Sequence, residues 1–264
     1  MEKFKHKKSL GQNFLNDNEI INNIAANANL TENDIVIEIG PGEGILTQKL
    51  AEKSKKVIAI EIDDRLIPIL NDKFENTKNI EIIHDGILNI NMIDFFAKYK
   101  LDNKNYKVIA NIPYYITAPI IRLFLELKNP PTEIILMVQK EVAERLTASP
   151  GKMSILGISA QYYADVNYLF TVNREKFNPA PKVDSAVVKL EIKNKKTEED
   201  KEFFRVVKIG FSAKRKTLCN NLANGFQRDK KDIENILEKF NLKKNVRAQE
   251  LSIDDWKKLE KELI

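Results

Sequence analysis

The sequence has few of the residues on which metal sites, disulfides and low-complexity structures depend. Cys219 is its single cysteine, and His6 and His84 are its two histidines among 264 residues. An internal disulfide and a zinc site built from cysteine and histidine are therefore excluded, and we expect no metal. Neither histidine lies in a motif that would support a serine hydrolase. Glycine and proline, nine residues each, are too scarce for a collagen-like or linker-dominated chain.

Long apolar segments are also absent. The longest uninterrupted one runs from Ile134 to Val138, whereas a membrane-spanning helix needs about 18 or more apolar residues. The first 14 residues are basic and contain no apolar segment, so they do not form a secretory signal. We therefore expect a cytoplasmic protein with no membrane partner. The length and the 43% hydrophobic content fit one large α/β domain with a small second domain.

Positive charge is concentrated at the two ends of the chain. Residues 1–194 carry 25 basic and 25 acidic side chains, whereas residues 195–264 carry 18 basic and 13 acidic ones. No acidic residue lies between Glu202 and Asp229, and the first eight residues hold a second basic cluster. Solubility alone could explain this surplus. A polyanion held against a neutral catalytic domain is the alternative, and its contacts would then include Lys7, Lys8, Arg205, Lys208, Lys214, Arg215 and Lys216.

Strand-like and helix-like segments alternate between residues 35 and 192. The early strands are near-continuous apolar runs, which is typical of strands covered on both faces of a parallel sheet. We expect a doubly wound α/β fold. The last two strands have no helix between them, which predicts an antiparallel pair at the sheet edge. The predicted strands are Ile35–Ile39, Val57–Ile62, Ile80–His84, Lys107–Ala110, Glu133–Val138, Val166–Val172 and Val183–Ile192.

The helix-like segments divide into two groups. Those in the sheet region are Asn18–Asn29, Leu46–Lys53, Arg65–Phe74, Thr117–Lys128 and Glu141–Thr147. After Ile192 a charged stretch, residues 194–202, is the expected linker, and only helical patterns follow. They are Glu198–Phe211, Lys214–Asn224, Asp232–Phe240 and Ile253–Glu262. We therefore expect a domain boundary at residue 194, with a small all-helical domain over residues 195–264.

Three strand ends carry candidate ligand-binding residues. The first strand ends in Gly40-Pro41-Gly42-Glu43-Gly44, where glycines let the backbone approach a ligand closely. This spacing resembles the nucleotide turn of S-adenosylmethionine (AdoMet)-dependent methyltransferases rather than a dinucleotide fingerprint. Glu61 follows Gly40 by 21 residues, at a strand end where a carboxylate can bind both ribose hydroxyls. In the methyltransferase arrangement, Asp85 after the third strand accepts a hydrogen bond from the adenine amine.

The fourth strand ends in Asn111-Ile112-Pro113-Tyr114, the most specific signal in the chain. An exocyclic adenine amine is a poor nucleophile because its lone pair is delocalised into the ring. The amide oxygen of Asn111 and a nearby backbone carbonyl can accept its two N–H bonds and direct the lone pair toward a methyl donor. Pro113 stiffens the turn. The face of Tyr114 can stack on the base, a role that leaves its hydroxyl unused.

The sequence resembles the ribosomal RNA adenine N6,N6-dimethyltransferases over nearly its full length, and most closely the KsgA family that modifies small-subunit RNA. The segments that carry the resemblance are Lys8–Leu15, Gly40–Gly44, Asn111–Tyr114, Asn178–Ser185 and Phe211–Leu218. The resemblance implies a Rossmann-like methyltransferase domain whose mostly parallel seven-stranded sheet has an antiparallel edge strand. It also implies AdoMet as cofactor, with contacts at Asn13, Leu15, Gly40, Glu61, Asp85 and Asn111.

Under this resemblance, Asn111, Pro113 and Tyr114 are the catalytic residues, and the product is dimethyladenine at two adjacent positions near the RNA 3′ end. The expected partners are small-subunit RNA and a small-subunit assembly intermediate, bound by a monomer. Two alternatives remain: the sister group that dimethylates large-subunit RNA and confers macrolide resistance, and a non-catalytic RNA-binding assembly factor. The loop at Ser149–Ser154 is several residues shorter than is usual in the family, which leaves its contribution open.

Overall fold

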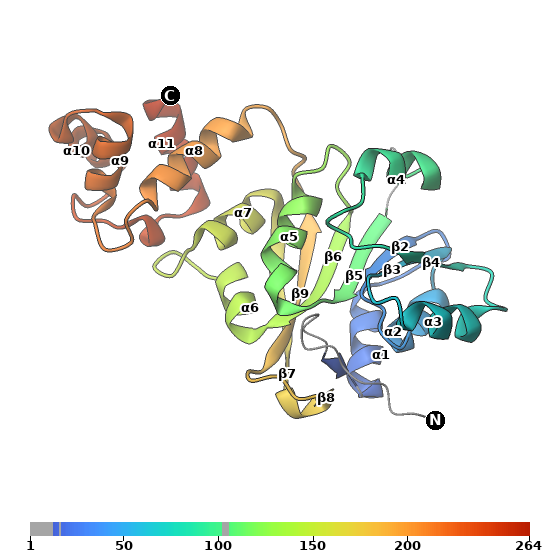
Figure 1. The fold of residues 1–264 in the computed structure, drawn as a ribbon. Helices are drawn as coiled ribbons and strands as arrows, with labels where there is room; N and C mark the ends of the chain where they lie inside the picture. Colours follow the sequence, from blue (N-terminus) through green and yellow to red (C-terminus); the bar gives the residue numbers. More distant parts are fainter. Residues whose placement is uncertain (1–12, 16, 102–105) are drawn as a thin grey trace.

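The computed structural model describes residues 13–15, 17–101 and 106–264, and its centre is a seven-stranded sheet (Figure 1). The strand order is β4-β3-β2-β5-β6-β9-β7. The four pairings from β4 to β6 are parallel, whereas β9 is antiparallel to both of its neighbours. The strand bounds are β2 Ile35–Ile39, β3 Lys56–Glu61, β4 Ile80–His84, β5 Tyr106–Asn111, β6 Glu133–Gln139, β7 Ala164–Val172 and β9 Ser185–Ile192.

The expected α/β class and the antiparallel pair at the sheet edge are confirmed. Within that pair, β7 is the edge strand, and β9 occupies the penultimate position between β6 and β7. A second, two-stranded sheet pairs β1 (Phe14–Leu15) with β8 (Phe177–Asn178). No helix among the described residues is long and apolar enough to cross a membrane.

Helices cover both faces of the large sheet, because successive strand residues point to opposite sides. On one face Ile37 and Ile58 pack with α4, α5, α6 and α7. On the other face Val36 and Val57 pack with α1 and α2. The helix bounds are α1 Asn18–Asn27, α2 Ile45–Ala51, α3 Leu66–Phe74, α4 Met92–Tyr99, α5 Thr117–Leu125, α6 Lys140–Leu146 and α7 Ile155–Tyr163.

Two helices of this region, α4 and α7, were absent from the sequence-based prediction. The short helix α4 depends on its cap, where the Asn91 side chain accepts from the amide of Ile93 at 3.0 Å. Helix α7 has no continuous polar face, because it packs against α5 and β7 on one side and α8 on another. Its Gly157 approaches α6 so closely that a β-carbon there would lie 2.5 Å from the carbonyl oxygen of Arg145. Its sequence therefore lacks the periodicity of a surface helix.

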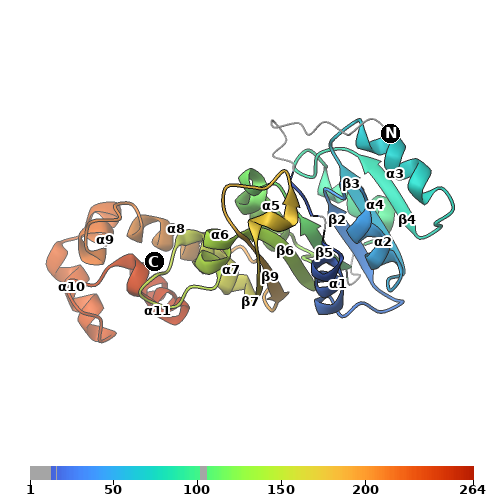
Figure 2. The ribbon, with the colours of Figure 1, turned by 90° about the horizontal axis from the view of Figure 1, so that it is seen from below.

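The C-terminal helices surround their own apolar cluster beyond the β9–β7 edge (Figures 1 and 2). Trp256 is fully buried at its centre against Gly210, and truncating it to alanine is expected to destabilise the fold by about 3–5 kcal/mol. Ser252 and Asp255 form a capping box at the start of the last helix. The helix bounds are α8 Asp200–Gly210, α9 Leu218–Phe226, α10 Lys230–Lys239 and α11 Ile253–Leu263.

The charged segment that was expected to be a linker is fixed to the sheet region at Asp200. This buried carboxylate accepts hydrogen bonds from the hydroxyls of Tyr162 (2.9 Å) and Tyr163 (2.8 Å) on α7, and from the amide of Thr197 (2.9 Å). Burial raises the pKa of Asp200, but these hydrogen bonds outweigh that effect, and its pKa lies below the ordinary value. The start of α8 is therefore held against α7 by these hydrogen bonds.

The loop at Ser149–Ser154 also contacts the C-terminal region. The backbone amides of Gly151 and Met153 both donate to the carbonyl oxygen of Gln249, at 2.8 and 3.1 Å. Met153 is buried in the same apolar cluster as Trp256. The loop therefore helps to attach the C-terminal helices to α6 and α7.

Candidate active site

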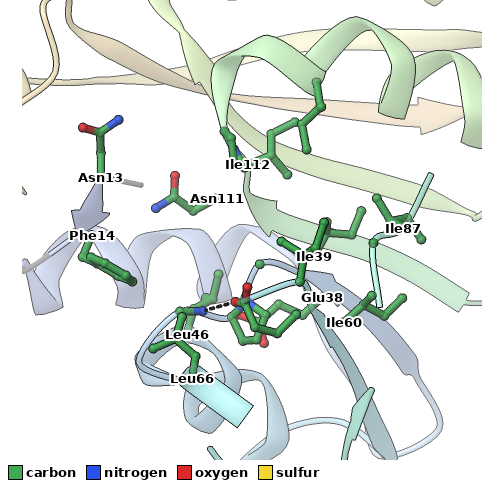
Figure 3. Close-up of a pocket in the computed structure, with 18 of the residues that line it drawn as sticks. Asn13, Phe14, Glu38, Ile39, Leu46, Ile60, Leu66, Ile87, Asn111 and Ile112 are labelled. Carbon is green, nitrogen blue, oxygen red and sulfur yellow. Dashed lines mark hydrogen bonds between the residues drawn. The ribbon is translucent and has the colours of Figure 1, made fainter. Parts of the chain in front are cut away.

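A cavity of about 320 Å³ lies at the carboxyl ends of β2, β3, β4 and β5. Figure 3 shows Asn13, Glu38 and Asn111, which come from three different parts of the chain, among the side chains around it. Every residue that the sequence predicted for the cofactor or for catalysis lines this one space: Asn13, Leu15, Gly40, Glu61, Asp85, Asn111, Pro113 and Tyr114. The exposed His84, the last residue of β4, is not among the lining residues.

The glycine turn after β2 forms the edge of the cavity nearest the N-terminal segment. Gly40 and Gly42 have positive φ angles of 68° and 58°, which residues with a β-carbon rarely adopt. A β-carbon on Gly42 would lie 2.8 Å from the ring of Phe14, so this glycine also makes room for the segment that covers the turn. Gly40 keeps its side toward the cavity open, because a β-carbon there would still lie 3.8 Å from the carbonyl oxygen of Asn111.

Glu61, at the end of β3, is 5% exposed and is held by backbone amides. Its carboxylate accepts from Asp63 at 2.8 Å and from Gly42 at 3.3 Å, so it ties the glycine turn to β3. Burial raises the pKa of Glu61, although these hydrogen bonds act in the opposite direction. The hydrogen bonds fix the carboxylate in one orientation at the cavity wall.

Glu38 is a second buried acid in the cavity, and the sequence analysis assigned it no role. It is 1% exposed on β2, and its Oε2 has no hydrogen-bond partner among the residues that the structure describes. Burial, reinforced by the charge of Glu61, raises the pKa of Glu38 to about 8. A buried carboxylate oxygen without a partner favours a cationic ligand. The signal in the sequence was a lone acid within the apolar run Ile35–Ile39.

Asp85 differs from the two buried acids. It follows β4, is exposed, and accepts from the amide of Gly86 at 2.7 Å. Ile62 and Leu88, which are 52% and 46% exposed, line the cavity near this end. Asp85 is thus a solvated acceptor beside an apolar surface, an arrangement suited to the polar edge and flat faces of a purine.

The Asn111–Tyr114 segment faces the glycine turn across the cavity. Asn111 ends β5, and Pro113, with φ −57° and ψ 135°, leads into a short 3₁₀ turn at Tyr114–Ile116. Tyr114 is half-buried, and its hydroxyl lies 2.7 Å from Oγ of Ser185. Burial raises the pKa of Tyr114, so the phenol is neutral at physiological pH. Tyr115, 63% exposed, extends the lining toward solvent.

The start of the described chain lies over the cavity. Strand β1 pairs with β8, which places Phe14 opposite Asn178 and Leu15 opposite Phe177. An ion pair of 2.7 Å between Asp17 and Lys176 adjoins this pairing. The predicted cofactor contacts Asn13 and Leu15 are therefore held at the cavity, whereas the predicted RNA contacts Lys7 and Lys8 lie outside the described residues.

The predicted RNA-contacting residues of the C-terminal region are not brought to the cavity. All five are exposed, and none of them lines the cavity: Arg205, Lys208, Lys214, Arg215 and Lys216. The guanidinium of Arg205 is committed in part, because it donates to Glu202 at 3.1 Å and lies 5.5 Å from the ring centre of Phe226. The other four lie at the end of α8 or in the loop before α9.

Comparison with known proteins places these features in one family. The family model described as ribosomal RNA adenine dimethylase matches residues 3–264. Ribosomal RNA small subunit methyltransferase A of Alkaliphilus metalliredigens is 43% identical, over 99% of this chain and 93% of the relative. The protein of the same name from Fusobacterium nucleatum is also 43% identical, over 96% of both chains.

Solved structures agree with this placement. A dimethyladenosine transferase from Plasmodium falciparum is 31% identical, covers 93% of this chain and 95% of its own, and superposes with a TM-score of 0.77. The 23S rRNA methyltransferase ErmE is 26% identical, covers 95% and 99%, and also has a TM-score of 0.77. The match of family model, sequence and fold extends over nearly the whole chain. The chain therefore belongs to the ribosomal RNA adenine dimethylase family.

Proposed function

We propose that this protein uses AdoMet to dimethylate the N6 amines of two adjacent adenines near the 3′ end of small-subunit ribosomal RNA. The observation that carries the proposal is the single cavity in which the glycine turn and two buried acids face Asn111 and Tyr114. One side of the cavity therefore favours a cation, and the opposite side can orient a base. Transfer of a methyl group from a sulfonium to a base requires both.

The residues present fit AdoMet on independent grounds. Glu38 supplies a buried carboxylate oxygen, Oε2, that has no partner among the described residues and can meet a positively charged amino acid end, near Gly40, whose surroundings leave space for a ligand. The fixed carboxylate of Glu61 can accept from ribose hydroxyls, and the exposed Asp85 can accept from the adenine amine. Asn13, Leu15 and Asn111 complete the enclosure. When bound, AdoMet supplies an electrophilic methyl group on a sulfonium.

The chain's own residues then orient the nucleophile. The side-chain oxygen of Asn111 accepts one N–H of the target amine, and a backbone carbonyl of the turn accepts the other. Tyr114 presents its ring to the base face, which excludes water from that side and holds the amine in line with the methyl donor. A strong general base is unnecessary, because the nitrogen becomes acidic as it gains the methyl group and its proton passes to solvent.

The basic residues of the C-terminal helices serve as phosphate contacts in this proposal. Lys214, Arg215 and Lys216 follow α8 without an acidic neighbour, and a folded RNA offers closely spaced phosphates. Such contacts fix the register of the RNA rather than its sequence. Discrimination then comes from the shape of the assembling subunit and from the two unpaired adenines that reach the cavity.

Large-subunit RNA is the second candidate substrate, because ErmE, a 23S rRNA methyltransferase, shares the fold over 95% of this chain. The small subunit is favoured because relatives named for it are about 43% identical, against 26% for ErmE. A non-catalytic assembly role is disfavoured because the acids, Asn111 and Tyr114 are all retained in the cavity.

The test offers purified protein and labelled AdoMet to undermethylated small subunits and, in parallel, to naked large-subunit RNA. Primer-extension stops at two adjacent adenines of the small-subunit RNA are expected, with Asn111→Ala as the control that binds RNA but turns over slowly. Stops confined to large-subunit RNA would overturn the choice of substrate. Absence of methyl transfer to either RNA, by protein that binds small subunits, would leave only the assembly role.

A further inference from the structure

The Tyr114 ring is fixed at both of its ends. At the near end, the rigid Pro113 leads directly into the turn that carries Tyr114. At the far end, the hydroxyl forms a hydrogen bond of 2.7 Å with Oγ of Ser185, 71 residues further along the chain. Stacking through the ring face alone gives no reason for this bond, because that role leaves the hydroxyl unused.

Ser185 is itself held in the most constrained part of the sheet. It is fully buried at the first position of β9, where it pairs with Gln139 on β6 and with Val172 on β7. The amide of Lys140 also donates to the carbonyl oxygen of the preceding Asp184 at 3.0 Å. The backbone that carries the Ser185 hydroxyl is therefore fixed, because moving it would displace two strand pairings.

We propose that Ser185 is a positioning residue for methyl transfer, which acts by holding the Tyr114 ring in the orientation that receives the target base. An unrestrained tyrosine samples several staggered side-chain rotamers, and only some of them present the ring face to the cavity. Methyl transfer requires the amine, the methyl carbon and the leaving sulfur to be aligned, so a small rotation of the base slows it strongly. The inference rests on the proposed function.

The test is a double-mutant cycle in small-subunit methylation. Ser185→Ala and Tyr114→Phe each remove one partner of the same bond, so each is expected to lower kcat about tenfold. AdoMet affinity, measured by calorimetry, should stay unchanged, because neither hydroxyl belongs to the set that holds the cofactor. The Ser185→Ala/Tyr114→Phe double variant should be no slower than the slower single variant, because the two groups act as one unit.

A matched control removes a similar bond elsewhere. Tyr168 and Thr171 form a tyrosine–hydroxyl pair of 2.6 Å on β7, and neither residue lines the cavity. Tyr168→Phe should therefore leave kcat at the wild-type value. Thermal melts of all variants separate a loss of folding from a loss of alignment.

Two results would overturn the inference while the proposed function stands. One is a folded Tyr114→Phe protein with wild-type kcat, which decides the matter even if Ser185→Ala does not fold. The other is a double variant about 100-fold slower than wild type, since independent effects multiply. Failure of the wild-type protein to methylate small subunits would instead refute the proposed function.

Discussion

Replacing Glu38 by glutamine should change stability and cofactor affinity in opposite directions. The exchange keeps the shape of the side chain but removes its ability to ionise. Glu38 is 1% exposed, and burial raises its pKa from an ordinary 4.5 to about 8. At about 1.4 kcal/mol for each tenfold change, ionising this group in the folded protein is disfavoured by on the order of 5 kcal/mol relative to the unfolded chain.

The sign of the pH dependence follows from the raised pKa. Between pH 4.5 and about 8 the folded protein keeps a proton on Glu38 that the unfolded chain has already lost. The contribution of this group is therefore complete below pH 4.5 and is lost progressively as the pH rises toward 8. Glu38→Gln should melt at the wild-type temperature near pH 4.5 and several degrees higher at pH 9.

The affinity for AdoMet should decrease in the Glu38→Gln variant, whereas its stability at high pH increases. A hydrogen bond between a carboxylate and an ammonium group contributes about 1.5–3 kcal/mol to binding. Glu38→Gln should therefore weaken AdoMet binding at least tenfold at pH 7. Binding to the wild-type protein should also release a proton, because the ligand favours the ionised carboxylate. Calorimetry in buffers of different ionisation enthalpy measures that release, and the glutamine variant should show none.

Glu133→Gln is the matched control for this experiment. Glu133 is also a buried acid on a strand, but it forms an ion pair of 2.6 Å with Lys189 and does not line the cavity. This variant should lose stability and keep its AdoMet affinity. A Glu38→Gln protein whose melting temperature differs from wild type by the same amount at pH 5 and pH 9 would refute the assigned ionisation. Unchanged AdoMet affinity would refute the cation-binding role.

Further predictions concern the other residues of the site and the C-terminal helices. Glu61→Ala should weaken AdoMet binding by about one to two decades in calorimetry, and unchanged affinity in folded protein would exclude the ribose contact. Asn111→Ala should lower kcat while RNA affinity in filter binding stays constant; a parallel loss of RNA affinity would argue against its role in chemistry. Asp200→Ala should lower the melting temperature, because it leaves the buried hydroxyl of Tyr163 and the half-buried hydroxyl of Tyr162 without this acceptor; an unchanged melt would contradict the anchoring. When alanine replaces the exposed cations Lys214, Arg215 and Lys216, the slope of log K for RNA binding against log salt concentration should become shallower by about two to three. An unaltered slope would mean that these cations serve only solubility.

The strands could be predicted from the sequence almost to the residue, because strands covered on both faces leave apolar runs that polar turns interrupt. Ile35–Ile39 and Ile80–His84 have the predicted bounds. Helix α7 was missed for the opposite reason, since packing on several sides removes the polar face from its sequence. The position of β9 between β6 and β7 was also not specified, because an antiparallel pair can attach to a sheet through either strand.

The same contrast applies to the cavity. Gly40, Glu61, Asp85 and Asn111 could be predicted to meet, because parallel strands end at one edge of the sheet and the spacing identifies those ends. No role could be assigned to Glu38 from the sequence, because that role depends on a buried oxygen without a partner, which a sequence does not show. The bond between Tyr114 and Ser185 spans 71 residues, and no local pattern predicts it.

The anchoring of α8 at Asp200 determines where the C-terminal cations lie relative to the cavity. Tyr162 and Tyr163 of α7 both donate to Asp200 at the start of α8, and these bonds hold the helix that leads to the C-terminal cations against the sheet region. Under the proposed function, an RNA bound at these cations can place in the cavity only those nucleotides that lie at the corresponding distance along it. A longer or less restrained connection would then change which adenines are modified, or make the choice of adenines less specific, with no change in the cations or in the cavity.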